Sequence, residues 1–342
     1  MKTYTLKVVE VKPETCDTVT LKFKQPGLKK IKYLAGQYLT LIFRINGRRY
    51  LRPYSFSSSP SVDSTLDITI KRVHNGIVSN HIHDKINVGD VIEVLEPMGD
   101  FCVENIDHGN LFLWGVGSGI TPLISIAKET LAQNNQRKVN LIYGNKNLDQ
   151  TIFLELIHSL KLKYGDRFNV IYFYTKITVE PDFPFWLPGR ISREFVLDIM
   201  MGQNSTGLLH LICGPLGLKE TLVSTLLELG FSKKVILFED FELIKDPKDF
   251  IDIHTQNVQV QFENNDITLE VVKGQTILES ALDAGIELPY SCQTGSCNTC
   301  KAQVLQGTVK MIGIEKERKD LNEDDTLLCC SHPTSNNVLV KI

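Results

Sequence analysis

The stretch Tyr290-Ser-Cys-Gln-Thr-Gly-Ser-Cys-Asn-Thr-Cys300 holds three cysteines in the order C-x4-C-x2-C, and a further pair follows at Cys329 and Cys330. Four cysteine thiolates in this order are typical of a [2Fe-2S] cluster. The small residues Gly295 and Ser296 let the loop wrap round a cluster with its backbone N–H groups aimed at the sulfurs. Because such a centre passes one electron at a time, the sequence predicts an electron-transfer protein.

Two other uses of the cysteines compete with a cluster. Structural zinc sites usually pair their ligands as two C-x2-C or C-x2-H units, whereas the first pair here is spaced by four residues. Disulfides are disfavoured because the chain starts with an alternating, strand-like stretch rather than an apolar secretory leader, and cytosolic thiols stay reduced. We therefore expect a cluster first, zinc second and disulfides last.

The fourth ligand is either Cys329 or Cys330. The stretch Leu327-Leu-Cys-Cys-Ser-His-Pro333 is similar to the end of plant-type ferredoxins, in which the ligand lies four residues before the proline, and this favours Cys329. The interval from Cys300 favours Cys330, which leaves 29 intervening residues instead of 28. With Cys329 as the ligand, Cys330 is expected to be a small, buried apolar residue. The predicted ligands are Cys292, Cys297, Cys300 and Cys329.

Length and composition set the class of protein. A chain of 342 residues is expected to form two or three domains, and its 42% hydrophobic and 23% charged residues are ordinary for globular proteins. No run approaches the roughly 18 apolar residues that cross a bilayer. The net charge of −3 gives no reason to expect nucleic acid. We expect a soluble, cytoplasmic protein without a membrane span.

The charge is unevenly distributed along the chain. Residues 257–342 hold 12 acidic and 7 basic side chains, whereas residues 1–256 hold 28 acidic and 30 basic ones. An acidic redox domain can steer toward a basic surface on a partner. We therefore expect a partner protein to dock on the C-terminal part.

Residues 1–103 alternate apolar and polar side chains with a period of two, as half-buried strands do. Many short strands with turns between them indicate an antiparallel β-barrel. The predicted strands cover residues 4–11, 18–23, 37–43, 66–72 and 91–95.

Residues 104–242 change to apolar strands that alternate with helical stretches, which is typical of a parallel α/β domain. The predicted strands cover residues 110–115, 139–144, 168–173, 208–213 and 235–238, with helices over 122–132 and 216–229.

Residues 243–256 are polar, contain Lys-Asp-Pro-Lys-Asp, and are predicted to form a flexible linker. The remaining block, 257–342, is predicted to begin with a hairpin across Asn264-Asn265-Asp266 and a helix over 276–284. Its likeness to plant-type ferredoxins implies an α+β domain of the β-grasp type.

Four motifs stand in a fixed order along the chain. These are Arg52-Pro-Tyr-Ser55, Gly76-Ile-Val-Ser79, Gly115-Val-Gly-Ser-Gly-Ile-Thr-Pro122 and Cys213-Gly-Pro215. Each is weak alone, but together they resemble the ferredoxin-NADP reductase superfamily. With the appended ferredoxin the resemblance covers essentially the whole chain.

This resemblance implies a flavin-binding barrel over residues 1–103, an NAD(P)-binding domain over 104–242 and a plant-type [2Fe-2S] ferredoxin domain over 257–342. Reductase components of bacterial multicomponent oxygenases are built in this way. The reductase subunits of phenylacetyl-CoA epoxidase and the NADH oxidoreductase partner of hybrid-cluster protein share the arrangement.

The resemblance also implies that the flavin is FAD. Arg52 would neutralise the flavin pyrophosphate, since its planar donor fork suits phosphate oxygens. Tyr54 would cover one face of the isoalloxazine, and the Ser55 hydroxyl would lie near N5, the atom that accepts hydride. Gly76 would let the backbone approach the diphosphate, and Ser79 would add a hydroxyl and helix-end amides. The expected FAD-binding residues are Arg52, Pro53, Tyr54, Ser55, Gly76 and Ser79.

The glycine-rich turn differs from a Rossmann fingerprint. Ile120 stands where the third glycine would be, and no acidic residue closes the second strand at Tyr143-Gly-Asn-Lys146. A strand, a glycine turn and a helix opened by proline can still hold a diphosphate, although the same turn could merely pack a helix on a sheet. The expected nucleotide-binding residues here are Gly115, Gly117, Gly119, Thr121, Pro122, Cys213, Gly214 and Pro215.

By resemblance, Cys213 would lie beside nicotinamide C4 and Phe241 would be the aromatic residue that the nicotinamide must displace or share near the flavin. The alternative for Cys213 is inert packing, the usual role of a buried thiol. Together with Ser55, these two are the expected catalytic residues.

The choice between NADPH and NADH depends on a site for the 2′-phosphate. In the superfamily this site tends to follow the third strand of the nucleotide domain, where Thr175 and Lys176 offer a hydroxyl and a charge. Lys146 is another candidate, and a solvated lysine at a strand end is the alternative interpretation. We expect NADPH, with NADH as the alternative.

The predicted function is an NAD(P)H-dependent oxidoreductase that passes electrons through FAD and a [2Fe-2S] centre to a partner oxygenase. Two alternatives stay open. One is a reductase that acts alone on a small acceptor or serves another redox protein such as hybrid-cluster protein, and the other is a redox-sensing module that does not turn over.

Overall fold

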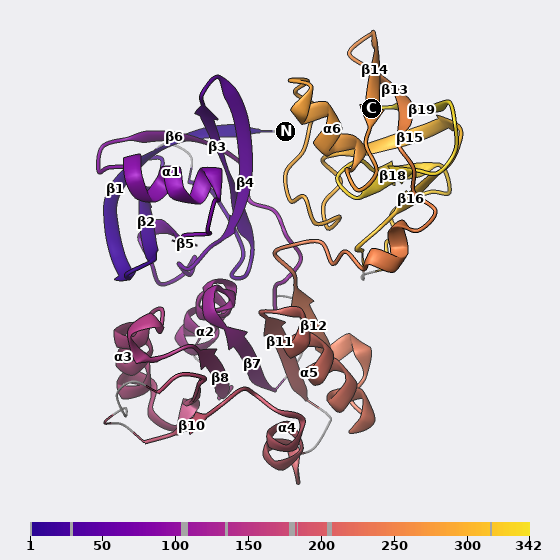
Figure 1. The fold of residues 1–342 in the computed structure, drawn as a ribbon. Coiled ribbons are helices and arrows are strands. Elements are labelled where there is room, and N and C mark those ends of the chain that lie inside the picture. Colours follow the sequence, from indigo (N-terminus) through magenta and orange to yellow (C-terminus); the bar gives the residue numbers. More distant parts are fainter. Residues whose placement is uncertain are drawn as a thin grey trace. The chain divides into compact units, whose positions relative to one another are not determined.

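The computed structural model describes residues 2–27, 30–103, 109–133, 136–177, 182, 184–203, 207–314 and 317–342. Contacts divide the chain into two units, Met1–Leu41 with Tyr54–Glu239, and Ile42–Pro53 with Asp240–Ile342. Figure 1 shows the elements along the chain. Among the described residues, no helix is long and apolar enough to span a bilayer.

The N-terminal part is an antiparallel barrel with one helix, α1 (Ile77–Lys85). Its strands form a sheet in the order β4-β3-β6-β1-β2-β5. An antiparallel bridge from Phe56, just after β4, to Ile68 in β5 closes this sheet into a barrel. All five predicted strands are confirmed, and β4 is an additional one. The strands are β1 (Thr3–Thr15), β2 (Thr18–Lys24), β3 (Tyr38–Ile45), β4 (Arg48–Ser55), β5 (Thr65–Lys71) and β6 (Val91–Leu95).

The second part is a parallel sheet in the order β10-β9-β8-β7-β11-β12, as predicted for an α/β domain. The strands are β7 (Asn110–Val116), β8 (Val139–Asn145), β9 (Phe168–Tyr174), β10 (Trp186–Pro188), β11 (Leu208–Cys213) and β12 (Ile236–Glu239). The strand order reverses between β7 and β11, and ligands of such sheets bind at the carboxyl ends of the strands beside this reversal.

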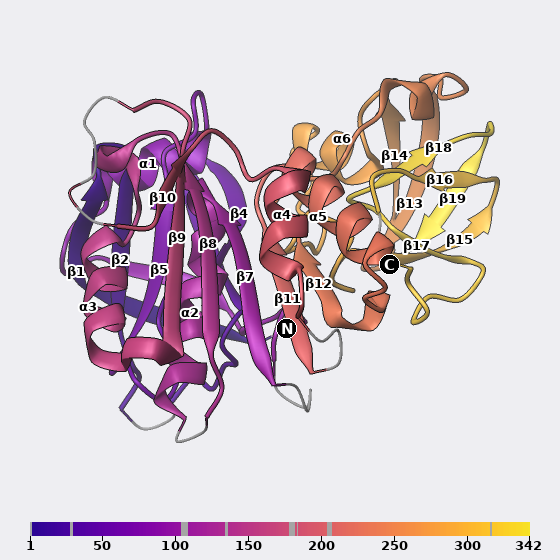
Figure 2. The ribbon, with the colours of Figure 1, turned by 90° about the horizontal axis from the view of Figure 1, so that it is seen from below.

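Helices cover both faces of the parallel sheet (Figure 2). Apolar residues of α2 (Ile120–Ala132) and α3 (Leu154–Tyr164) pack into one buried cluster, and those of α4 (Arg193–Met200) and α5 (Leu216–Glu228) pack into the other. The predicted helices α2 and α5 are confirmed, whereas α3 and α4 are additional. Short 3-10 turns are η1 (Gly117–Gly119), η2 (Leu148–Gln150), η3 (Gly165–Arg167), η4 (Lys233–Val235) and η5 (Pro247–Phe250).

Polar contacts hold α2 against the connection between β4 and β5. Lys128 is only 7% exposed, pairs with Asp63 and donates to the Ser57 carbonyl at 3.3 Å. The neighbouring Glu129 accepts from the Ser59 hydroxyl at 2.6 Å. Since a buried charge that loses its partner is strongly destabilising, these contacts fix the barrel to the α/β domain within the first unit.

His210 lies in the middle of β11 and is completely buried. The Trp114 Nε1–H donates to its Nδ1 at 3.2 Å, and the Phe231 ring packs edge-on at 4.7 Å. Burial lowers the pKa of His210 to about 3, so the ring is neutral in the folded protein. The unfolded chain, with a pKa near 6.5, binds the proton more readily.

We therefore expect the free energy of unfolding to fall as the pH drops below 6.5, by about 1.4 kcal/mol per pH unit from this group until the pH nears 3. Denaturant titrations at pH 7.5 and 5.5, followed by tryptophan fluorescence, measure this loss. A His210→Gln variant cannot take up the proton but can still accept from Trp114, so its stability should change less between the two pH values. An equal loss in both proteins would contradict the assignment.

The second unit contains a mixed sheet in the order β14-β13-β19-β15-β17, in which only β13 and β19 are parallel, and a separate β16-β18 pair. One helix, α6 (Ile277–Asp283), packs on this unit and starts with a capping box between Thr276 and Glu279. This is the β-grasp arrangement predicted for the C-terminal domain. The strands are β13 (Gln256–Phe262), β14 (Asn265–Val271), β15 (Lys301–Gln306), β16 (Val309–Met311), β17 (Asp325–Leu327), β18 (Ser331–Pro333) and β19 (Val338–Lys341).

The hairpin turn of this unit falls on Glu263 and Asn264, whose φ angles are 49° and 64°. The predicted turn is therefore one residue too late, because Asn265 and Asp266 already pair in β14.

Residues of the predicted linker 243–256 contact the rest of the second unit. The Lys310 ammonium lies 3.2 Å from the Asp249 carboxylate, and the rings of Phe250 and His332 meet edge-on at 5.1 Å. Lys245 pairs with Glu279 at 3.4 Å and the Thr255 hydroxyl accepts from the Lys273 N–H at 3.1 Å, so the segment is attached near both of its ends as well. The other predicted boundary, after residue 103, adjoins residues 104–108, which lie outside the described part.

Candidate functional site

The carboxyl ends of three parallel strands bring together the glycine turn, the Cys-Gly-Pro loop and an acid. Cys213 is in register with Gly115 on one side and with Glu239 on the other. A Cβ atom on Gly119 would lie 2.1 Å from the Cys213 carbonyl oxygen. Only glycine therefore permits this approach, and the two predicted nucleotide-binding loops touch.

A cavity of about 590 Å³ opens beside these loops, a size ordinary for a cofactor site. Gly117 lines it from the start of α2, and Pro215 and Gly217 line it from the start of α5. Two helix N-termini therefore border the cavity, which suits a diphosphate. Thr121 and Pro122 are buried in the first turn of α2, and the Thr121 hydroxyl donates to the Ser118 carbonyl of the glycine turn at 3.0 Å.

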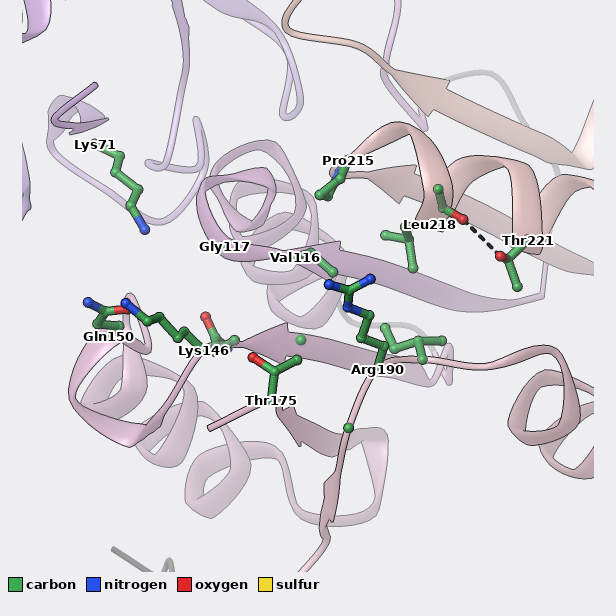
Figure 3. A pocket seen from close by; sticks show the side chains of 15 residues that line it. Lys71, Val116, Gly117, Lys146, Gln150, Thr175, Arg190, Pro215, Leu218 and Thr221 are labelled. Atoms are coloured by element: carbon green, nitrogen blue, oxygen red, sulfur yellow. Dashed lines mark hydrogen bonds between the residues drawn. The ribbon is translucent and has the colours of Figure 1, made fainter. Parts of the chain in front are cut away.

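Three cations, Lys71, Lys146 and Arg190, line the cavity, and no carboxylate of the described residues does. Figure 3 shows Lys71 entering from one side and Lys146 and Thr175 from another, with Arg190 between the strand ends and α5. Such a surface attracts an anion. Asn145 also lines the cavity.

The Asn145 side chain is only 6% exposed, and its amide interacts with the Tyr143 hydroxyl. An amide that lines the cavity in this way can also hydrogen-bond to a ligand.

Of the predicted 2′-phosphate residues, Thr175 and Lys146 line the cavity. Lys176 lies next to it, since its backbone N–H donates to the Lys146 carbonyl at 2.7 Å. Sequence reasoning missed Lys71 and Arg190. Lys71 ends a barrel strand and Arg190 follows β10, so only the folded chain brings them here.

Ser55 is buried, and its hydroxyl donates to the Glu239 carboxylate at 3.5 Å, at the long end for a hydrogen bond. Because Glu239 is in register with Cys213 on the neighbouring strand, the acid adjoins two of the three predicted catalytic residues. Sequence reasoning gave Glu239 no role, since an acid at a strand end has no local signature.

The remaining flavin-motif residues divide between the two units. Tyr54 is half-buried in the first unit, whereas Arg52 and Pro53 belong to the second. Phe241 also belongs to the second unit, is 47% exposed and follows Glu239 by two residues. The roles of these four residues stay predictions.

Gly76 and Ser79 form the start of α1. The Val73 N–H donates to the Ser79 hydroxyl at 3.1 Å, and a Cβ atom on Gly76 would lie 2.5 Å from that hydroxyl oxygen. Glycine therefore makes room for a serine that holds the turn together. The backbone at this turn remains the predicted diphosphate contact.

The four predicted cluster ligands come together in the second unit. Cys292, Cys300 and Cys329 are buried and Cys297 is half-buried. The backbone N–H groups of Thr294 and Cys297 both donate to the Cys292 sulfur at 3.4 Å. Hydrogen bonds from the thiols of Cys297 and Cys329 hold the pKa of Cys292 below its ordinary value.

The Cys329 thiol lies against those of Cys292, Cys300 and the adjacent Cys330, and hydrogen bonds with these three thiols raise its pKa. The Cys330 thiol is fully buried and also donates to the Leu327 carbonyl at 3.2 Å. Among the described residues, no group of three or more His, Cys, Asp or Glu side chains is arranged to hold a single metal ion. Four thiols with amides aimed at sulfur are nevertheless the donor set that a [2Fe-2S] cluster uses.

Three protein-family models match successive parts of the chain. They are the oxidoreductase FAD-binding domain over residues 5–102, the oxidoreductase NAD-binding domain over 113–223 and the 2Fe-2S iron-sulfur cluster binding domain over 260–334.

Relatives of similar length resemble the whole chain. The ferredoxin reductase component of 3-ketosteroid-9-alpha-monooxygenase from Rhodococcus rhodochrous is 31% identical, over 98% of this chain and 96% of the relative. A component of the 1,2-phenylacetyl-CoA epoxidase from Escherichia coli K12 is 29% identical, over 98% of this chain and 97% of the relative. Phthalate dioxygenase reductase shares the fold, with a TM-score of 0.69 at 21% identity over 99% of this chain and 98% of that structure.

The protein is an NAD(P)H-dependent oxidoreductase whose cofactors are FAD and a [2Fe-2S] cluster. Both the order of its domains and its full-length relatives show that the chain belongs to the ferredoxin-NADP reductase superfamily, in the group that carries a plant-type ferredoxin domain at the C-terminal side.

Proposed function

We propose that this protein is the reductase component of an oxygenase system and supplies single electrons to a partner oxygenase. The main support is that Glu239 adjoins both Ser55 and Cys213, close to a cavity lined by cations. The same chain also brings four cysteine thiols together. When bound, FAD would supply the site for hydride transfer from NAD(P)H, and the [2Fe-2S] cluster would supply a one-electron outlet. The protein residues bind, orient and tune these groups.

Each motif then has a role in the proposal. The turns at Gly117 and Pro215 hold the nucleotide diphosphate with helix-end amides, and Lys71 adds a positive charge. Cys213 positions the nicotinamide, and Ser55 contacts the reacting edge of the flavin. Glu239, 3.5 Å from the Ser55 hydroxyl, orients that hydroxyl. Arg52, Tyr54, Gly76 and Phe241 keep the roles that the family resemblance implies.

The partner is proposed to dock on the ferredoxin domain. Most of the 12 carboxylates in residues 257–342 are exposed, among them Glu317, Asp320 and Glu323. The relatives from Rhodococcus and Escherichia are named as components of a monooxygenase and an epoxidase. Electrostatic docking would make electron delivery slower at high salt. We place this system in the cytoplasm, where thiols stay reduced and free to bind iron.

An anaerobic titration of purified protein tests the function. NADPH or NADH should bleach the flavin and cluster absorption, and the reduced protein should then support product formation by a ketosteroid or phenylacetyl-CoA oxygenase component, more slowly as salt is added. Fast turnover with a quinone or ferric chelate, with no transfer to any oxygenase, would favour a reductase that acts alone. Failure of both nucleotides to bleach the protein would contradict the reductase function.

NADPH is the proposed donor, because Lys146 and Thr175 line a cavity without a carboxylate among the described residues. An acid at this place would repel a 2′-phosphate, and a lysine attracts it. A Lys146→Ala variant is expected to raise the KM for NADPH about tenfold, in line with the roughly 1.5–3 kcal/mol of a charged hydrogen bond, with little change for NADH. Steady-state kinetics with both nucleotides measure this, and a wild-type preference for NADH would overturn the choice.

A further inference from the structure

Arg318 makes a fork of contacts in the ferredoxin domain. Its guanidinium donates to the Gly295 carbonyl and to the Asn298 side-chain oxygen. Two of its nitrogens also donate to the two carboxylate oxygens of Asp320, each at 2.8 Å. Asn298 completes the set, since its amide donates to Asp320 at 2.8 Å. Every nitrogen of the guanidinium therefore donates to a defined acceptor.

The two loop contacts lie in different spacers of the cysteine motif. Gly295 lies in the spacer between Cys292 and Cys297, and Asn298 in the spacer between Cys297 and Cys300. Arg318 follows these residues by 23 and 20 positions. One side chain from a separate segment thus ties together both halves of the ligand loop.

The loop needs such a tie at Gly295. This residue has a φ of +71°, and a Cβ atom on it would lie 2.7 Å from the Ile314 side chain. Glycine is therefore required at this point of the turn, and Arg318 fixes its carbonyl.

The position of the charge is also defined. The Arg318 side chain is only 12% exposed, whereas its partner Asp320 is 48% exposed. The hydrogen bond to Asp320 raises the pKa of Arg318 against the opposing effect of burial. The guanidinium thus lies on the protein side of the pair, against Gly295 and Asn298 in the two spacers between the predicted ligands. Ordinary surface ion pairs contribute little, but a shielded, two-pronged one is stronger.

We propose that Arg318 is a positioning residue for the [2Fe-2S] centre, which keeps the ligand loop closed on the cluster and favours its reduced form. The inference rests on the ligand set proposed above and not on the identity of the partner. Net charge and hydrogen bonding around a cluster set its potential. Because reduction adds a negative charge, a fixed cation nearby makes reduction easier.

The test compares Arg318→Gln with Lys319→Gln in the full-length holoprotein. Both substitutions remove one positive charge from neighbouring positions, but Lys319 is 83% exposed and pairs only loosely with Glu317 at 3.7 Å. Two readouts need no partner oxygenase, namely the rate of cluster loss to an iron chelator, followed by visible absorption, and the midpoint potential of the cluster, followed by electron paramagnetic resonance.

Arg318→Gln is expected to speed cluster loss about tenfold and to lower the reduced-to-oxidised ratio at a fixed potential by up to about tenfold, which is 59 mV for one electron. Lys319→Gln should change each by less than about twofold, as expected for a solvated charge. Arg318→Lys keeps the positive charge but cannot form the two-pronged contacts. Compared with Arg318→Gln, it should therefore recover more of the midpoint potential than of the cluster retention.

Equal effects of Arg318→Gln and Lys319→Gln, or no effect of either, would overturn the proposal. If Arg318→Gln does not fold, Asp320→Asn replaces it, because it loosens the fork and leaves the guanidinium in place. That variant is expected to lose its cluster several-fold faster, and unchanged retention would count against the role. A wild-type protein that binds no cluster would instead contradict the proposed ligand set.

Discussion

A Cys329→Ala variant is expected to lose its [2Fe-2S] cluster while it keeps its flavin. Cys329 is the thiol that stands against both Cys292 and Cys300, and a cluster that loses one of its thiolates has no fourth ligand of the same kind. Iron analysis and the electron paramagnetic resonance signal of the reduced protein measure the loss. Flavin bleaching by NADPH should proceed at the wild-type rate, whereas electron delivery to a one-electron acceptor protein should be abolished.

Cys330→Ala is the matched control. Cys330 is also buried, but its thiol donates to the Leu327 carbonyl and meets the predicted ligands through Cys329. Removing one small buried group should cost on the order of 1 kcal/mol of stability and leave the cluster in place. The opposite pattern, with loss of the cluster in Cys330→Ala alone, would assign the fourth ligand to Cys330.

Local periodicity was enough to predict most of the barrel, and its one failure has a physical reason. β4 begins Arg48-Arg-Tyr and contains Pro53, a sequence without apolar alternation and with a residue that rarely occurs inside a sheet. The strand forms because Asn46 and Gly47 turn the chain back on itself, with φ angles of 51° and 78°. An Asn-Gly pair is the strongest short hairpin signal, and it would have found the strand.

The candidate site was predicted only where the sequence has local signatures. The glycine turn and Cys213 follow apolar strands, so their meeting at one edge of a parallel sheet could be predicted from the order of elements. Lys71 and Arg190 reach the cavity from β5 and from beyond the end of β10, and Glu239 reaches Ser55 from the end of β12. Their sequence neighbourhoods contain no motif, because their role depends on long-range packing.

Arg318 is a similar case in the ferredoxin domain. It stands in the charged run Lys316-Glu-Arg-Lys-Asp320, which by composition is indistinguishable from a solvated surface segment. Arg318 differs from its exposed neighbour Lys319 in its contacts with Gly295 and Asn298, which only the folded structure reveals. Charged residues that serve a site from a distance are therefore the class that sequence patterns miss.

Gly119→Ala is expected to have the second large effect, on hydride transfer. The new methyl group would lie 2.1 Å from the Cys213 carbonyl oxygen, against a normal contact of about 3.5 Å. The glycine turn and the Cys-Gly-Pro loop must then move apart by roughly 1 Å, and a misplacement of this size can slow a reaction about a hundredfold.

Stopped-flow bleaching of the flavin by NADPH measures the rate, and the same experiment over a range of NADPH concentrations separates binding from transfer. Gly27→Ala is the control, because its methyl group would meet no atom within 4 Å and it lies far from the cavity in sequence. A Gly119→Ala protein that is folded and reduced as fast as Gly27→Ala would show that close contact of the two loops is unnecessary. A rate that falls while the KM stays constant would instead show that this contact sets the position of the nicotinamide and not its affinity, because only the transition state then loses stabilisation.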